Sequence, residues 1–137
     1  MRTLILYYSY SGNTKLLAKE LAAELCADLQ KIQDEQRPGK LKAYALGCFA
    51  ALKGTAWPVK ALQADLSAYE RIVLMAPVWA GHVPPAVNAV WALLPQGTAL
   101  EVRLVSASGE SNCRARLETT LQGKGCTLAS LDDIRMR

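Results

Sequence analysis

The chain has 137 residues, of which 51% are hydrophobic, and its 16 basic and 12 acidic residues give a net charge of +4. A chain of this length can bury one hydrophobic core but not two, so we expect a single domain that spans residues 1–137. No apolar run reaches the roughly 18 residues of a membrane-spanning helix, the N-terminal apolar run is short for a secretory signal, and no basic stripe indicates a nucleic-acid surface, so we expect a cytoplasmic protein with neither membrane nor nucleic acid as a partner.

The first predicted elements are a strand over residues 3–9 and a helix that begins at Asn13 or Thr14 and ends near Ala27. The strand is apolar on both faces, which is typical of a central strand in a parallel sheet that helices cover on both sides. Leucines recur at helical spacing and mark one side of the helix as buried. These leucines are Leu16, Leu17, Leu21 and Leu25.

The loop between this strand and helix has the composition of an anion site. The first N–H groups of a helix lack intrahelical partners and lie at the positive end of the helix dipole. Ser9, Ser11 and Thr14 add hydroxyl donors around Gly12. An ordinary helix cap explains one polar residue here but does not require four of them around a glycine. The loop therefore predicts a site for a phosphate monoester.

The next part of the chain has a weaker pattern. Residues 28–33 predict a short second strand at an edge of the sheet, before a turn at residues 36–39. From residue 40 to residue 66 the pattern is helical but interrupted by Gly47, Gly54 and Trp57-Pro58. We therefore expect a short helix, a loop and another short helix in this segment.

A strongly apolar strand is predicted over residues 72–78, and a turn that contains Trp79 follows it. With this segment in place, two parts of the chain resemble the flavodoxin family. The motif Ser9-x-Ser11-Gly12-Asn13-Thr14 resembles the family's loop that holds the phosphate of FMN. Residues 71–85 are similar to the family's third strand and following loop, where a Trp-containing turn lies against the isoalloxazine ring.

The resemblance implies that FMN is the cofactor and that the loops after three strands hold it. In the family, such a Trp stacks on the flavin, which suits Trp79, and the peptide beside Gly81 can flip to accept a hydrogen bond from the reduced ring. His82 is more readily explained as a turn residue than as a proton donor, and it is the one catalytic candidate. The residues that the resemblance assigns to FMN binding are Ser9, Tyr10, Ser11, Gly12, Asn13, Thr14, Pro77, Val78, Trp79, Ala80, Gly81, His82, Ser106, Ala107, Ser108 and Gly109.

Two further elements follow the Trp79 turn. Pro84-Pro85 opens a predicted helix that Pro95-Gln96-Gly97 closes. Four residues at helical spacing would form the buried side of this helix, namely Val87, Val90, Trp91 and Leu94. A strand is then predicted over residues 100–106.

The last third of the chain predicts one more loop, helix and strand. Residues 106–111 look like a third cofactor loop, and Ser111 or Asn112 is the expected cap of the helix that follows. Cys113, Leu117 and Leu121 would form the buried stripe of this helix, which ends at Gly123. The last strand is predicted over residues 126–131.

Strands that alternate with helices imply an α/β fold with a parallel sheet and right-handed crossovers. The resemblance selects a flavodoxin-like doubly wound five-stranded sheet in the order 2-1-3-4-5. In such a sheet the ligand lies beyond the carboxyl ends of the strands at the switch point, which is where the loops of residues 9–14 and 79–82 emerge.

The chain departs from the family at its end, because the six residues that remain after the fifth strand are too few for a full C-terminal helix. Either residues 40–66 fold across the sheet face that this leaves, or a second subunit covers it. Because a large uncovered apolar face is rare on a soluble monomer, we expect a homodimer.

The cysteines and the single histidine indicate that no metal is bound. Cys26, Cys48, Cys113 and Cys126 form no CxxC pair and no zinc-ribbon spacing, so they are interpreted as reduced packing residues. One histidine, His82, cannot build a His-rich site.

Three functions remain open. The first is an FMN-dependent oxidoreductase that passes electrons to a small acceptor such as a quinone. The second is an electron carrier without its own turnover, and the third is a binding module that has lost the cofactor. Family carriers are typically strongly acidic, so the net charge of +4 favours the first over the second. Without a GxGxxG fingerprint, NAD(P)H would bind only transiently, and a redox partner protein is the other candidate electron donor.

Overall fold

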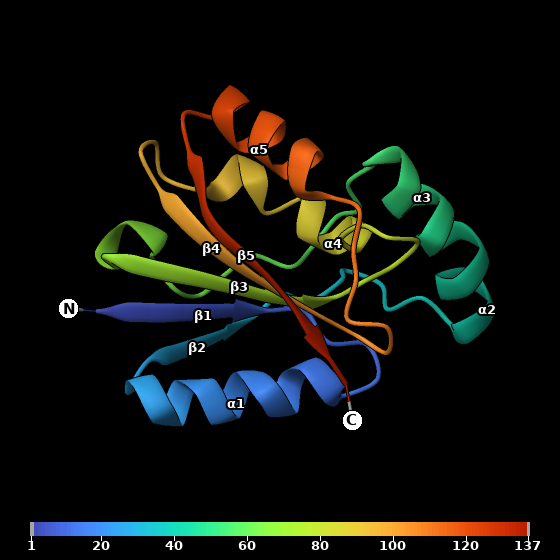
Figure 1. Ribbon diagram of the computed structural model, residues 1–137, viewed down its shortest axis with the longest axis horizontal. Helices are drawn as coiled ribbons and strands as arrows, with labels where there is room; N and C mark the ends of the chain where they lie inside the picture. The colour runs from blue at the N-terminus through green and yellow to red at the C-terminus, as the bar shows by residue number, and fades with distance from the viewer. Residues whose placement is uncertain (1, 137) are drawn as a thin grey trace.

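The computed structural model describes residues 2–136 and contains one parallel sheet of five strands in the order β2-β1-β3-β4-β5. Every pair of neighbouring strands runs parallel (Figure 1). The α/β class and the strand order predicted from the sequence are therefore confirmed. The strands are β1 (Thr3–Tyr7), β2 (Asp28–Lys31), β3 (Arg71–Pro77), β4 (Ala99–Ser106) and β5 (Thr127–Arg135).

Helices cover both faces of the sheet (Figure 1). One face packs against α1 (Asn13–Leu25), and the other packs against α4 (Pro85–Asn88) and α5 (Arg114–Gly123). Side chains alternate between the faces along each strand, so Leu4 and Leu6 join the larger core while Ile5 joins the core under α1. Both sets are almost fully buried, which explains why the central strands are continuous apolar runs.

The region of residues 40–66 differs from the prediction of two short helices. A single helical segment runs through α2 (Lys40–Lys42), a π-helical turn (Ala43–Gly47) and α3 (Cys48–Lys53). The chain does not break at Gly47, because this residue has an ordinary right-handed helical φ of −67°. The second predicted helix is wrong apart from one 3-10 turn at Leu66–Ala68.

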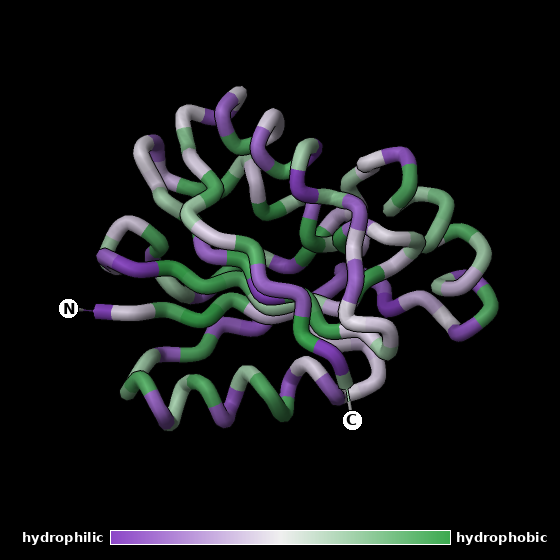
Figure 2. The backbone as a smooth tube through the Cα atoms, in the orientation of Figure 1, coloured by the Kyte–Doolittle hydropathy of each residue, from purple (hydrophilic) through white to green (hydrophobic). Residues whose placement is uncertain are grey.

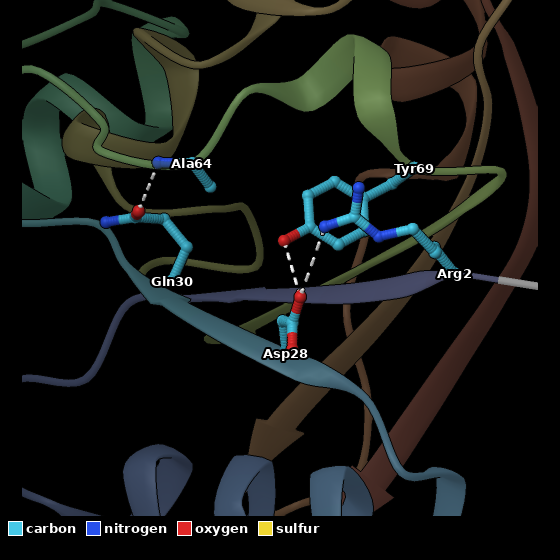
Figure 3. Close-up of polar contacts among 5 residues, drawn as sticks. All are labelled: Arg2, Asp28, Gln30, Ala64 and Tyr69. Atoms are coloured by element: carbon cyan, nitrogen blue, oxygen red, sulfur yellow. Dashed lines mark hydrogen bonds and ion pairs between the residues drawn. The ribbon is translucent and has the colours of Figure 1, made fainter.

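Residues on either side of this 3-10 turn, together with Arg2, contact side chains of the edge strand β2 (Figure 3). The backbone N–H of Ala64 donates to Gln30 Oε1 at 2.8 Å, and the hydroxyl of Tyr69 donates to Asp28 Oδ2 at 2.6 Å. The guanidinium of Arg2 lies 3.7 Å from the same carboxylate oxygen. An irregular segment thus covers one edge of the sheet.

The two later helices are partly as predicted. The four residues expected on the buried side of the helix after Pro84 are all buried, but the helix divides into α4 and a 3-10 turn at Trp91–Leu93. The stripe expected on α5 is also buried. Its predicted cap at Ser111 or Asn112 is wrong, because Cys113 occupies the cap position and the N–H of Asn112 donates instead to Gly81 O at 2.7 Å.

Strand β5 extends beyond the predicted end at residue 131 and pairs with β4 up to Arg135. On the face that α1 covers, the register places Glu101 beside Ser130 and Arg103 beside Asp132. Arg71 also forms a two-bond ion pair with Glu101, at 2.6 and 2.9 Å. The part of the sheet that the sequence left without a helix is therefore polar, and the apolar face from which we expected a homodimer is not present among the described residues.

Within residues 2–136, no helix has both the length and the apolar character required to cross a membrane.

Candidate functional site

The loop between β1 and α1 has the geometry of an anion site. Gly12 occupies the cap position of α1 with a φ of 102°, a left-handed conformation that favours glycine. Gly12 has no side chain to cap the first N–H groups of α1, and the first turn holds no acidic residue. A Cβ on Gly12 would meet no atom within 4 Å, so the space over the loop is open. The first N–H groups of α1 therefore face an uncovered position that suits an anion.

The polar side chains around this loop either hold its turn or lie at its surface. Ser9 Oγ accepts a hydrogen bond from Gly12 N at 3.1 Å, which fixes the turn. Ser11 and Asn13 are exposed, whereas Thr14 is buried at the start of α1. The loop thus presents hydroxyl and amide groups at its surface while its backbone is held by its own contacts.

The turn after β3 is tight and contains two residues with positive φ. Trp79 N donates to His82 O at 2.8 Å, and His82 N donates to Trp79 O at 3.0 Å. Between them, Ala80 has a φ of 52° and Gly81 a φ of 81°. A left-handed alanine is strained, and such strain is typical of turns that a function constrains.

Trp79 has protein neighbours on more than one side of its ring. Its ring lies edge-on to those of Tyr8 and Tyr10, with centroids 6.0 and 5.9 Å away. A Cβ on Gly47 would lie 2.7 Å from Trp79 Cζ3, so the helical segment covers the ring from another side. Packing alone therefore explains the position of Trp79, and its stacking on a flavin stays a prediction.

The loop after β4 is the third of the predicted site loops, and it contacts the Trp79 turn. Gly109 N donates to Ser106 Oγ at 3.0 Å, and Glu110 N donates to Ser108 Oγ at 3.2 Å. The bond from Asn112 to Gly81 joins this loop to the Trp79 turn. Because β1, β3 and β4 are neighbours in the sheet, all three predicted loops emerge at the same edge, to the right of the sheet in Figure 1.

His82 belongs to the turn and is half-buried. Its Nδ1 is buried without a hydrogen-bond partner among the described residues. Burial lowers the pKa of His82, and the nearby positive charge of Arg116 lowers it further. The imidazole is therefore neutral near pH 7, which leaves a polar atom in need of a partner.

A buried pair of polar side chains next to the site was missed by the sequence reasoning. The hydroxyl of Tyr8 donates to Asp34 Oδ2 at 2.6 Å, and Asp34 is 7% exposed. Burial raises the pKa of Asp34, while the hydrogen bond from Tyr8 and the charges of Arg37 and Lys42 lower it. Burial also raises the pKa of Tyr8, with Asp34 adding to the effect. Only the fold brings these residues together, because they are 26 positions apart.

A cavity of about 600 Å³ opens between Asp34 and the helical segment. Trp57 lines it, and a Cβ on Gly47 would contact both Trp57 and Trp79, so the cavity is a neighbour of the Trp79 turn. Its walls combine aromatic rings with two carboxylates and one ammonium group, a combination that suits a flat molecule with polar edges. The lining residues are Asp34, Glu35, Gln36, Lys42, Leu46, Phe49, Ala50, Thr55, Trp57 and Pro58.

Comparison with known proteins gives structural likeness only. No protein-family model and no curated protein sequence matches the chain. A flavoprotein from Lactobacillus acidophilus, solved in complex with FMN, is similar with a TM-score of 0.76 and 19% identity, over 95% of this chain and 91% of that one. A Bacteroides eggerthii protein assigned to the flavoproteins reaches a TM-score of 0.80 at 17% identity, over 96% and 86% of the two chains. Flavodoxin 2 from Bacillus cereus has a TM-score of 0.58 at 17% identity, over 99% and 85%. The chain therefore has the flavodoxin-like fold over nearly its whole length.

Proposed function

We propose that the protein binds FMN at the three loops and acts as an oxidoreductase that passes electrons to a small acceptor. The observation that carries the proposal is the uncapped N-terminus of α1 behind Gly12, with open space over it and no carboxylate in its first turn among the described residues. Phosphate monoesters are dianionic near neutral pH, so this helix end and the hydroxyls of Ser9 and Ser11 suit the phosphate of FMN.

The other two loops would hold the flavin ring. Residues 77–82 and 106–109 lie at the same edge of the sheet as the phosphate loop. The strained Ala80 belongs to this region, and such strain is typical of a functional turn. The FMN complex of the Lactobacillus acidophilus neighbour supports the same cofactor here.

Bound FMN supplies one- and two-electron transfer, and the protein positions the ring and controls access to it. The cavity beside Trp57 favours an enzyme over an electron carrier, because its volume of about 600 Å³ is that of a small-molecule site. A flat acceptor such as a quinone fits its aromatic walls. Asp34 lines the same cavity and, since its pKa is raised, is placed to exchange a proton there.

The first experiment is a titration of the protein with FMN and with riboflavin, followed by the quenching of flavin fluorescence. We expect one equivalent of FMN to bind more tightly than riboflavin. Replacing Ser11 by Ala removes one hydrogen bond to the phosphate and should weaken FMN binding by about fivefold to tenfold while leaving riboflavin binding unchanged. Ser130→Ala, a serine in β5 at the far side of the sheet, is the matched control and should change neither.

Equal losses for FMN and riboflavin in Ser11→Ala would contradict the phosphate assignment. An absence of FMN binding by the unaltered protein would remove the redox function and favour a cofactor-free binding module. Steady-state oxidation of NAD(P)H with a small quinone then separates the two remaining functions. Turnover supports the oxidoreductase, whereas FMN binding without turnover favours the electron carrier.

A further inference from the structure

The helical segment of residues 40–53 carries its large apolar side chains on the outside. Leu41 is 82% exposed and Tyr44 78% exposed, and Leu46, Phe49 and Leu52 are each more than half exposed. Leu41, Tyr44 and Leu52 recur at helical spacing, so they share one face of the segment. The other exposed large apolar residues, Leu16, Leu29 and Leu93, are scattered singly over other elements.

The inner face of the same segment is built from small residues. Ala43, Gly47, Ala50 and Ala51 are buried, and Gly47 lies directly against the ring of Trp79. Small residues let the helix approach the domain closely, while Leu41, Tyr44 and Leu52 are exposed and do not line the cavity beside Trp57, unlike Leu46 and Phe49. This is the reverse of an ordinary amphipathic surface helix, whose large apolar residues face the core.

The segment is held firmly in this orientation. Arg116 of α5 donates to the carbonyl oxygens of Ala51 at 3.0 Å and Leu52 at 2.8 Å, so the last turn of α3 is anchored to the neighbouring helix. The contact of Gly47 with Trp79 fixes its middle. The apolar face is thus presented as a fixed surface rather than by a loose segment.

The charged residues within the stretch 37–60 have one sign, and the neighbouring Asp34 and Glu35 lie on the cavity side of the segment. From residue 37 to residue 60 the chain contains no Asp or Glu. Its basic residues are Arg37, Lys40, Lys42, Lys53 and Lys60. Lys53 Nζ lies 5.2 Å from the ring centroid of Phe49, whereas Lys42 Nζ lies 5.7 Å from that of Trp57 on the cavity side. Lys40 and Lys53 are exposed at the two ends of the segment. Figure 2 shows the predominantly apolar colouring of this segment, which lies on the side of the molecule labelled α2 and α3 in Figure 1.

We propose that the helical segment of residues 40–53 docks the protein on a negatively charged lipid surface. Leu41, Tyr44 and Leu52 would enter the boundary between headgroups and acyl chains, while Lys40 and Lys53, at the two ends of the segment, reach lipid phosphates. A second copy of the chain fits this surface less well, because pairing two such segments would bring their cations together with no acidic residue from either segment between them.

This inference reverses the expectation that no membrane is a partner. That expectation considered spanning segments, and an interfacial helix needs neither the length nor the continuous apolar character of a spanning helix. It does not rest on FMN binding, because it concerns a different face of the helical segment from the one that contacts Trp79.

The experiment is flotation of the protein with vesicles of phosphatidylcholine alone and with vesicles that contain one part phosphatidylglycerol to two parts phosphatidylcholine. We expect binding to the anionic vesicles at low salt, little binding to the neutral ones, and loss of binding at high salt. Lys53→Gln should weaken partitioning by about fivefold, since a basic residue near an anionic surface contributes about that factor. Leu41→Ser should weaken it by about tenfold.

Two controls on α1, which lies on the opposite face of the sheet, match these variants. Leu16→Ser exchanges an equally apolar, 61% exposed leucine, and Lys19→Gln removes an exposed lysine. Both should bind vesicles as the unaltered protein does, and circular dichroism checks that all four variants are folded.

Three results would overturn the proposal. The first is failure of the folded protein to bind anionic vesicles at low salt. The second is equal loss of binding in the α1 controls, which would make the attraction a matter of overall charge and hydrophobicity. The third is a dimer in light scattering that Leu41→Ser converts to a monomer, which would assign the surface to a second copy of the chain.

Discussion

Substitution of Gly47 by Ala tests the contact that joins the helical segment to Trp79. Gly47 has a φ of −67° and a ψ of −45°, so its backbone does not need a glycine. On helix propensity alone, alanine would stabilise the protein by about 1 kcal/mol. Its Cβ, however, would lie 2.7 Å from Cζ3 and 3.1 Å from Cε3 of Trp79. Inserting a methyl group into a packed position costs about 1–3 kcal/mol, so we expect a net loss of about 1 kcal/mol.

A second helical glycine provides the matched control. Gly123 lies at the end of α5, and a Cβ there would meet no atom within 4 Å. Gly123→Ala therefore gains helix propensity without a clash and should stabilise the protein by about 0.5 kcal/mol. The two variants make the same chemical change and are expected to have opposite signs.

Urea unfolding followed by circular dichroism measures both free energies of unfolding. For a domain of this size, a loss of about 1 kcal/mol lowers Tm by roughly 3 °C, which thermal unfolding also resolves. Tryptophan fluorescence should change in Gly47→Ala, because the ring of Trp79 must move, and should be unaltered in Gly123→Ala. If Gly47→Ala were as stabilising as Gly123→Ala, the close contact described here would be refuted.

Three further predictions concern titratable groups. Burial raises the pKa of Asp34, so the fold loses stability as pH rises through that pKa and the carboxyl ionises. Asp34→Asn still accepts the hydrogen bond from Tyr8 and carries no charge. Urea unfolding should therefore show that its stability relative to the unaltered protein increases from acidic to neutral pH. The pKa of His82 is lowered in the fold, so stability should fall as pH drops below about 6.5, the pKa of histidine in the unfolded chain. Because the chain has one histidine, a proton NMR titration measures this pKa directly. A pKa at or above 6.5 would contradict the burial of the imidazole. Arg71 lowers the pKa of Glu101, so the ion pair stabilises the fold when Glu101 is ionised. Glu101→Gln should lower the free energy of unfolding by about 1 kcal/mol at neutral pH, and by progressively less as pH falls through that pKa. A loss that does not change with pH would show that packing rather than charge is lost.

The central strands were predictable because only one arrangement explains their hydrophobic pattern. The runs around Ile5 and Leu74 are apolar on both faces, and only a parallel sheet between two helical layers buries both faces of a strand. The tight turn at Gly12 was also predictable, since its positive φ and the bond from Gly12 N to Ser9 Oγ are local, whereas phosphate binding there stays a prediction. Where local preference and tertiary packing agree, the sequence suffices.

The helical segment and the Asp34 pair were not predictable in the same way. Gly47 was interpreted as a helix breaker, yet its lack of a side chain serves a contact with Trp79, 32 positions further along the chain in the printed sequence. The outward-facing apolar residues also hid the true inner face, because periodicity identifies an apolar side and not the direction in which it points. Tyr8 and Asp34 meet only after the sheet has formed.

The length of β5 has a consequence for solubility. It lies at the end of the sheet, so one of its sides carries backbone groups that no neighbouring strand pairs within the described residues. Such an edge can template cross-chain strand pairing and aggregation. Asp132, Asp133 and Arg135 are exposed along it, and the register of β5 against β4 shifts near its start. Charged groups and an irregular register both oppose edge-to-edge association, so the exposed charges of β5 disfavour strand pairing between copies of the chain.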